Sequence, residues 1–140
     1  MNGPPEVIAE LRRWIEKAEA DLRTAEYLLT MKERCPFDVV CFHSQQCAEK
    51  YLKALLVQLD SEFPKTHDLV VLFNLARDKA GLILRVEDVQ PLNRYSIEAR
   101  YPGEWEPIDG IEAGSAVTMA GKVRAAVRPL LPAQAFEDQT

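Results

Sequence analysis

Apolar residues return every three or four positions over much of the chain, which is the spacing of one face of an α-helix. Three long stretches show it clearly, over about residues 5–31, 36–59 and 111–130, and two shorter ones cover about 66–81 and 87–99. Strand-like alternation of apolar and polar residues is not convincing anywhere. We therefore expect an all-α protein, an antiparallel, up-and-down bundle of four to five helices in one domain spanning residues 1–140.

Turn-forming residues separate these stretches. Pro36 and Pro91 stand where a helix can begin, because the first turn has no use for the missing amide. Thr66 is expected to cap the third helix, with Asp68 in its first turn. Residues 101–110 contain two Pro and two Gly, which predict an irregular loop. The acidic tail after about residue 132 is expected to fray.

The second long stretch opens with a polar run that a core helix does not need. On a helical projection Ser44 falls on the apolar face and Gln45 beside it, and a buried amide is costly unless its hydrogen bonds are made. We expect these two side chains to bond to a neighbouring helix or across a dimer interface, and a ligand contact is the alternative. Phe42 and Gln46, on the opposite side, are the other candidate interface residues.

The same projection places Glu49 and Lys53 away from the main apolar face. This pattern predicts a solvated face with a Glu49–Lys53 pair contributing a few tenths of a kcal/mol. Lys50 is expected on that face too. His43, at its edge, is expected to be a capping or interface residue, with a role in a ligand cleft as the alternative.

Composition narrows the classes of function. The 140 residues carry a formal net charge of −5, which argues against broad clamping of nucleic acid but leaves room for a small basic pocket. No apolar run is long enough to cross a membrane, and we see no signal peptide. Three cysteines, an odd number, indicate reduced thiols and a cytoplasmic protein. Only His43 and Cys47 share a face, which is too few ligands for structural zinc, so we expect no metal and no cofactor.

Four segments, in order, resemble one known family. They are WIEKAEADLRTAEYLL at Trp14 to Leu29, FHSQQCAEKYLKALL at Phe42 to Leu56, THDLVVLF at Thr66 to Phe73, and YSIEARYPG at Tyr95 to Gly103. The second segment is the most specific of the four. Together they make the chain similar to the HEPN domain, a small helical module often encoded beside a minimal nucleotidyltransferase in prokaryotes.

The resemblance implies a homodimer and one of two functional settings. Many HEPN proteins are metal-independent RNA endonucleases, often toxins, marked by an Arg followed after four to six residues by His. Others lack that mark and are regarded as partners of the nucleotidyltransferase, in toxin–antitoxin or stress-defence cassettes, or as nucleotide- or RNA-binding modules. This chain has two histidines, His43 and His67, and neither follows an Arg at that distance; Arg34 is the nearest before His43.

The missing mark favours a binding module, with a ribonuclease that has an altered active site as the alternative. Arg94, Arg100 and Tyr101 are the strongest candidates for contact with nucleotide or RNA. A guanidinium can hold a phosphate through two hydrogen bonds, and a Tyr ring can stack on a base. The competing interpretation is local structure, with Arg94 paired to Glu98 one turn later. His43 and Lys50 complete the candidate ligand residues.

Overall fold

The computed structural model describes residues 4–96 and 107–137, and within these residues the chain has four α-helices and no strand. The helices are α1 (Pro5–Leu29), α2 (Phe37–Gln58), α3 (Leu69–Arg77) and α4 (Gly110–Val127). Short 3-10 helices lie between and after them: η1 (Lys32–Arg34), η2 (Val86–Asp88), η3 (Gln90–Tyr95), η5 (Arg128–Leu130) and η6 (Ala133–Phe136). The predicted all-α class, a helical bundle, is confirmed.

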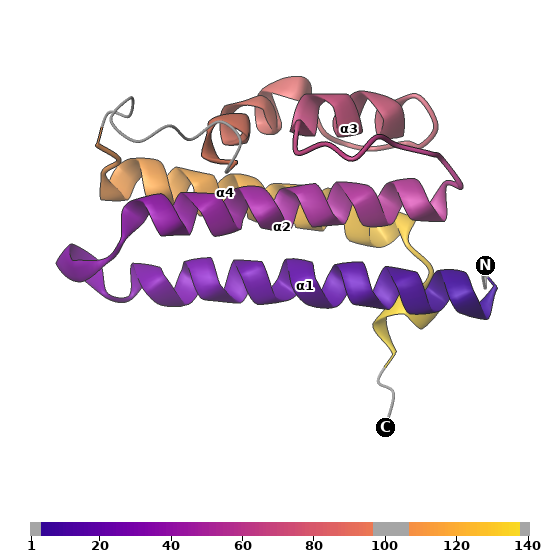
Figure 1. Ribbon diagram of the computed structural model, residues 1–140, viewed down its shortest axis with the longest axis horizontal. Coiled ribbons are helices and arrows are strands. Elements are labelled where there is room, and N and C mark those ends of the chain that lie inside the picture. The colour runs from indigo at the N-terminus through magenta and orange to yellow at the C-terminus, as the bar shows by residue number, and fades with distance from the viewer. Residues whose placement is uncertain (1–3, 97–106, 138–140) are drawn as a thin grey trace.

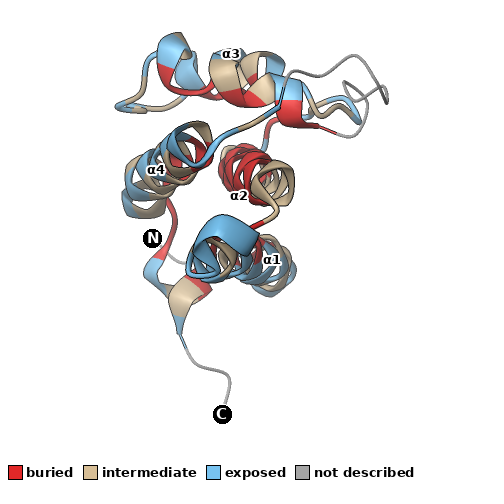
Figure 2. Ribbon diagram, turned by 90° about the vertical axis from the view of Figure 1, so that its left-hand side faces the viewer, coloured by how far each residue is buried: buried red, intermediate tan, exposed pale blue. Residues whose placement is uncertain are grey.

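Helix α2 is the centre of the bundle. It packs against α1, α3 and α4, and the end-on view shows α1 on one side of it and α3 on the other, with α4 alongside (Figure 2). Thirteen of its 22 residues are buried, so it has no broad solvent face. A helix enclosed in this way needs partners for its polar side chains as well as for its apolar ones.

The helices do not simply alternate in direction. The long helices α1 and α2 are antiparallel neighbours joined by a short connection (Figure 1). The connections on either side of α3 then carry the chain back, so that α4 runs in the same direction as α2. The contacts agree, because the starts of the two helices are close. A Cβ atom placed on Gly110, at the start of α4, would lie 3.4 Å from the ring of Phe37, at the start of α2. An up-and-down alternation therefore describes α1 and α2 but not the later helices.

Small residues let α4 approach α2 closely. The buried face of α4 consists of Ala and Val side chains, whereas α2, on which it packs, contains larger fully buried residues such as Tyr51 and Leu52. Each large apolar side chain buried in this way contributes roughly 1.5–3 kcal/mol. Within the described residues, no helix is both long and apolar enough to span a membrane.

Three predictions about local structure are wrong. Helix α3 begins at Leu69 and is capped by Asp68, whose carboxylate accepts from the amides of Val70 and Val71; Thr66 instead accepts from the amide of Asp68. The helix expected over 87–99 is replaced, as far as Tyr95, by η2 and η3. Side-chain hydrogen bonds to nearby backbone and to α3 compete with the α-helical pattern there.

The C-terminal segment is the third correction. Fraying does not begin at residue 132 in the described part of the chain, because residues 133–136 form η6 with Ala135 buried. Arg12 of α1 donates from Nε and Nη2 to the carbonyl oxygen of Gln134, at 3.1 and 2.7 Å. The guanidinium of Arg128 lies over the ring of Phe136, with its Cζ atom 4.2 Å from the ring centre. The Arg12 bonds fasten the segment to α1, and the Phe136 contact fastens it to η5.

Candidate functional site

The polar run of α2 meets α1 at Asp21. Nδ1 of His43 lies 2.8 Å from Oδ1 of Asp21, and Nζ of Lys50 donates to Oδ2 of the same carboxylate. Asp21 is only 8% exposed, and the seven-residue step from His43 to Lys50 places them on one face of α2, two turns apart. We call these three residues the Asp21 cluster. It joins α1 to α2 through one carboxylate and two nitrogen-bearing side chains.

A second cluster lies on the other side of α2, around Glu49. Lys53 donates to its Oε2 at 3.0 Å and Gln45 to its Oε1 at 3.0 Å. Nδ1 of His67 lies 2.8 Å from Oε1, and Gln45 also donates to the carbonyl oxygen of His67 at 3.3 Å. This Glu49 cluster, Gln45, Glu49, Lys53 and His67, ties the connection before α3 to the middle of α2.

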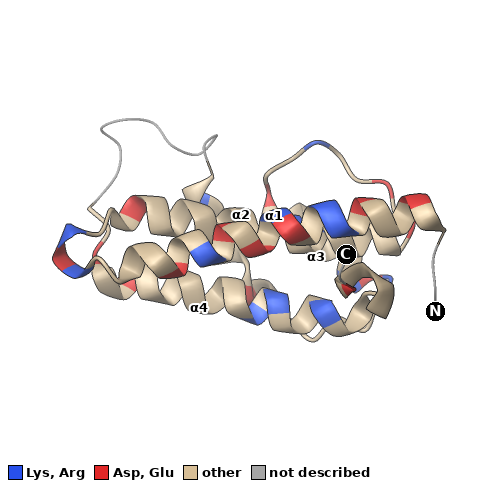
Figure 3. Cartoon of the chain, turned by 90° about the horizontal axis from the view of Figure 1, so that it is seen from below, with Lys and Arg blue, Asp and Glu red and all other residues tan. Residues whose placement is uncertain are grey.

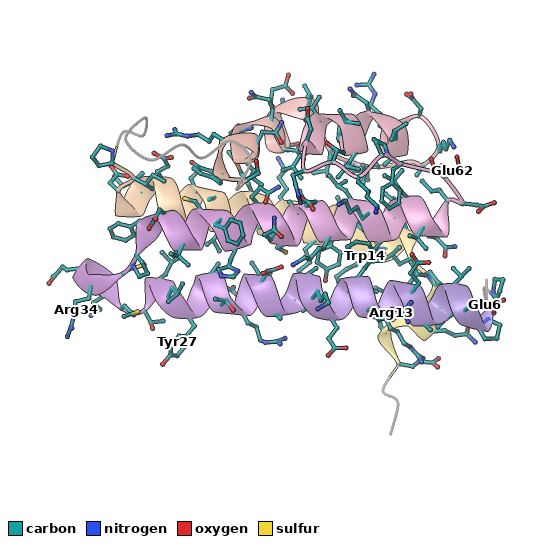
Figure 4. All side chains as sticks on the ribbon, in the orientation of Figure 1. Glu6, Arg13, Trp14, Tyr27, Arg34 and Glu62 are labelled. Carbon is teal, nitrogen blue, oxygen red and sulfur yellow. The ribbon has the colours of Figure 1, made fainter. Side chains whose placement is uncertain are left out.

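The solvated face predicted for Glu49 and Lys53 is wrong. The two residues are 3% and 8% exposed, because the connection before α3 covers that side of α2. The ammonium of Lys53 also lies 5.7 Å from the centre of the Trp14 ring, a cation–π contact. Trp14 itself lies between α1 and α2 (Figure 4). A helical projection could not reveal a helix covered on both sides.

The candidate interface residues are divided between interior and rim. Ser44 is fully buried and donates to the carbonyl of Val40 in its own helix, at 2.9 Å. Gln45 is fully buried in the Glu49 cluster. Gln46 donates to Oε1 of Gln45 at 2.7 Å. Phe42 is partly exposed, and its ring meets that of His43 edge-on with centroids 5.3 Å apart. Of the four, Phe42 and Gln46 retain exposed surface for a partner.

A third polar network links α1, α2 and α4. Glu19 accepts from Nε and Nη2 of Arg124 at 2.8 and 2.9 Å and from the hydroxyl of Tyr51 at 2.8 Å. Arg128 donates to that hydroxyl at 3.1 Å. Burial on its own raises the pKa of Glu19, but the bonds from Arg124 and Tyr51 outweigh it and lower the pKa. Burial and the bond to Glu19 raise the pKa of Tyr51.

Arg94 borders a groove of about 550 Å³ between η3 and the start of α4. Its Nη1 lies 3.3 Å from Oε2 of Glu112, which also accepts from the hydroxyl of Tyr95. Burial and that bond raise the pKa of Tyr95. Burial raises the pKa of the neighbouring Cys41 thiol to about 11. The groove therefore offers one exposed guanidinium, shared with a carboxylate, and no activated nucleophile among the described residues.

The candidate ligand residues do not form one site. Arg94 lies at the η3–α4 groove, whereas His43 and Lys50 are bound to Asp21 on the side of α2 that faces α1. The remaining candidates, Arg100 and Tyr101, lie outside the described residues, as does Glu98, the pairing partner expected for Arg94. In the described part of the chain Arg94 pairs with Glu112.

Metal-binding geometry is absent from the part of the chain that the structure describes. No three His, Cys, Asp or Glu side chains gather there closely enough to hold an ion. Cys35, Cys41 and Cys47 are free and buried. Burial raises the pKa of each thiol, which keeps it protonated and unreactive at neutral pH.

Sequence reasoning missed the carboxylates that organise these clusters. Asp21 lies three residues after Ala18 and next to Leu22, so its position on the buried stripe of α1 was visible in the spacing. Glu19 gave no such signal, since its partners Arg124 and Arg128 lie more than 100 residues further on. Only the fold brings those residues together.

Fold and site together define a class of protein: a helical bundle whose central helix carries polar residues on both packed sides. The family model for the HEPN domain matches residues 11–130, so the chain belongs to the HEPN family. A solved structure, TT1696 from Thermus thermophilus, is similar with 27% sequence identity and a TM-score of 0.68, over 86% of this chain and 98% of that one. No functionally curated protein matches the sequence.

Proposed function

We propose that this chain is a dimeric HEPN-type binding module that partners a minimal nucleotidyltransferase in a prokaryotic toxin–antitoxin or stress-defence cassette. Family membership supports the module. The observation against catalysis is the separation of His43 from Arg94, because Nδ1 of His43 is held by Asp21 between α1 and α2 whereas Arg94 pairs with Glu112. The Arg-to-His mark of the family's ribonucleases is also missing from the sequence, and the partner and the cassette are proposed from the family resemblance.

Metal-free cleavage of RNA needs a group that takes the 2′-hydroxyl proton and a cation for the charge that develops on phosphorus. Arg94 does not line the same contact as His43; its guanidinium is shared with Glu112 across a different groove. Among the described residues, the histidine and Arg94 therefore lie at separate contacts, His43 between α1 and α2 and Arg94 between η3 and α4. A binding role does not require a general base and a cation to lie together.

Nucleotide or RNA contact is the ligand function we propose for the Arg94 groove, with Arg100 and Tyr101 as further contacts. Arg94 is exposed and lies over the Tyr95 ring, 5.4 Å from its centre. A guanidinium supported by an aromatic face is suited to phosphate or base contact. Its bond to Glu112 makes a weak surface pair that a phosphate can replace.

A ribonuclease with an altered active site is the second candidate, and one observation favours it. The Asp21 carboxylate at Nδ1 of His43 is the arrangement that orients a histidine as a general base through its other nitrogen. The His43 side chain is 26% exposed, and Lys50, bound to the same carboxylate, supplies a cation nearby.

The deciding experiment is an RNA-cleavage assay without added metal, on the wild-type protein, His43→Asn and Arg100→Ala. We expect none of the three to cleave. Cleavage by the wild type that either substitution abolishes would establish the ribonuclease and overturn the binding module.

Assembly is tested separately. We expect size-exclusion chromatography with light scattering to give twice the 15.8 kDa chain mass, and a tagged chain to retain a co-expressed minimal nucleotidyltransferase. Phe42→Glu is expected to give monomers, with helix content by circular dichroism as the folding control. A monomeric wild type, or an unchanged dimer in Phe42→Glu, would contradict the assembly proposed or the face assigned to it.

A further inference from the structure

A larger groove lies on the other side of the molecule, between α1 and the C-terminal segment. Its volume is about 750 Å³. Four arginines line it, three from α1 and one from η5: Arg12, Arg13, Arg23 and Arg128. We call it the arginine groove. It shares no lining residue with the Arg94 groove, and basic positions are visible near the C-terminal segment in the view from below (Figure 3).

Most of these arginines are not neutralised by a carboxylate. Arg12 donates to the backbone carbonyl of Gln134, a partner without net charge. Arg13 and Arg23 are exposed and form no ion pair with any described residue. Arg128 alone lies near an acid, with Nη1 3.6 Å from Oε1 of Glu19. Three guanidinium groups thus keep donors available.

The acidic side chains of the groove reduce this charge without cancelling it. Glu16, Glu19 and Glu137 also line the groove. Glu19 is already bound through two hydrogen bonds to Arg124, which lies outside the lining. A local excess of positive charge therefore remains on a chain whose formal net charge is −5. On such a chain a positive groove concentrates anions at one place.

Spacing and shape indicate the kind of anion. Arg13 and Arg23 are ten residues apart on α1, which is about 15 Å along the helix axis, so a single phosphate cannot reach both. Guanidinium groups match phosphate oxygens through paired hydrogen bonds. The groove volume falls within the roughly 300–1,000 Å³ of small-molecule sites. Phe136, with Arg128 on one face, forms an apolar wall.

We propose that the arginine groove binds an oligophosphate, a small ligand with several linked phosphate groups, through Arg12, Arg13 and Arg23. The ligand is either inorganic or the phosphate end of a nucleotide. The site is independent of the Arg94 groove and of assembly with a nucleotidyltransferase. Bound phosphates would also bridge α1 to the C-terminal segment, because Arg12 belongs to α1 and donates to Gln134 of that segment.

Isothermal titration calorimetry at low salt tests the proposal, with sodium tripolyphosphate and adenosine 5′-triphosphate as separate probes and adenosine as the phosphate-free control. We expect the protein to bind tripolyphosphate, and the double variant Arg13→Gln, Arg23→Gln to bind it at least tenfold more weakly. Arg94→Gln, an exposed arginine in the other groove, is the matched control and should change affinity less than twofold. Comparison of the two phosphate probes distinguishes an inorganic ligand from a nucleotide.

Thermal unfolding supplies a second readout, because a ligand that binds only the folded state raises Tm. Tripolyphosphate should raise the Tm of the wild type and not that of the double variant, while the two proteins without ligand unfold alike. No binding of either phosphate probe at about 1 mM, equal weakening in Arg94→Gln, or binding of single-stranded RNA alone would overturn the proposal. Retention of the nucleotidyltransferase by the double variant is expected in every case and is measured separately.

Discussion

The Glu49 cluster and the arginine groove are both rich in charge, but their charges have different partners. In the cluster a buried carboxylate has Lys53, Gln45 and His67 within 3.0 Å. In the groove Arg13 and Arg23 have no ion partner among the described residues. The first arrangement binds one part of the chain to another. The second leaves hydrogen-bond donors available to something outside the chain.

The difference has a physical cause. Removing a charge from water costs several kcal/mol, and only close, well-oriented partners offset it. Accordingly, no buried side-chain nitrogen or oxygen in the described residues lacks a hydrogen-bond partner. An exposed arginine stays hydrated and needs no partner to be stable. Buried ionic residues in this bundle are thus structural, while exposed ones, unpaired or in a weak surface pair, are the candidates for ligand contact.

The largest effect on stability is expected from Glu49→Ala. The substitution leaves Lys53 buried with its cation unpaired and removes an acceptor from Gln45. We expect the free energy of unfolding, measured by urea denaturation, to fall by about 3–5 kcal/mol. Glu62→Ala, at an exposed position, is the control and should change it by less than about 0.5 kcal/mol. A loss in Glu49→Ala no larger than the control would break the comparison.

Glu19→Gln tests a carboxylate that belongs to both kinds of region, since it lines the groove and bonds to Arg124. We expect a loss of about 2 kcal/mol at pH 7. The lowered pKa of Glu19 sets the pH dependence. Its contribution is complete above the ordinary value of 4.5 and is lost as the pH falls through the lowered value.

Urea denaturation of the wild type and Glu19→Gln at pH 7, 5, 4 and 3 measures this dependence. The difference in the free energy of unfolding should be constant from pH 7 to 5 and shrink below that. Glu16→Gln, an exposed acid one turn earlier on α1, is the matched control. A difference that grew on acidification would show that Glu19 does not stabilise the fold as a carboxylate.

Asp68→Ala addresses an intermediate case, an exposed carboxylate that has partners. Its Oδ1 accepts from the amide of Val70 and from Nδ2 of Asn93, both at 2.9 Å. Loss of a helix cap of this kind costs about 1 kcal/mol, which we expect as a lower midpoint in chemical denaturation. Thr66→Ala should cost less. The reverse order would mean that Thr66, not Asp68, is the effective cap.

The smallest effect on stability is expected from Arg13→Ala and Arg23→Ala. Neither side chain has an ion partner in the described part of the chain, so each substitution should change the free energy of unfolding by less than about 0.5 kcal/mol. Chemical denaturation without added phosphate measures this. A loss above about 1 kcal/mol from either substitution would mean that the groove arginines are structural, and the contrast with the Glu49 cluster would disappear.

The sequence predicted the long helices well, because their apolar spacing is strong over many turns. The expected ranges 5–31, 36–59 and 111–130 correspond to α1, α2 and α4 with differences of at most three residues at any end. Prediction failed where local side-chain bonds decide the backbone, as in η2, where Asp88 accepts from the amide of Arg85. It failed too at residues 133–136, because their contact with Arg12 is remote in sequence.

The candidate sites were harder to predict for a related reason. His43 and Lys50 can be identified from their place on α2, but their shared partner Asp21 lies on another helix. Glu49 is wrongly predicted on a solvated face because a projection of one helix contains no information about its neighbours. The arginine groove was not predicted at all, since its arginines come from two segments more than 100 residues apart.

The central position of α2 has a consequence for the order in which the protein is made. The α1–α2 hairpin is complete at Gln58, but α4, which covers another side of α2, begins only at Gly110. At about 5–20 residues per second, the ribosome needs roughly 3–10 s to synthesise the residues between the end of α2 and the start of α4. During that time the face of α2 that later packs on Ala113, Ala116 and Ala120 is open to other nascent chains. Translation speed through residues 59–109 therefore governs how long this protein must be shielded from aggregation.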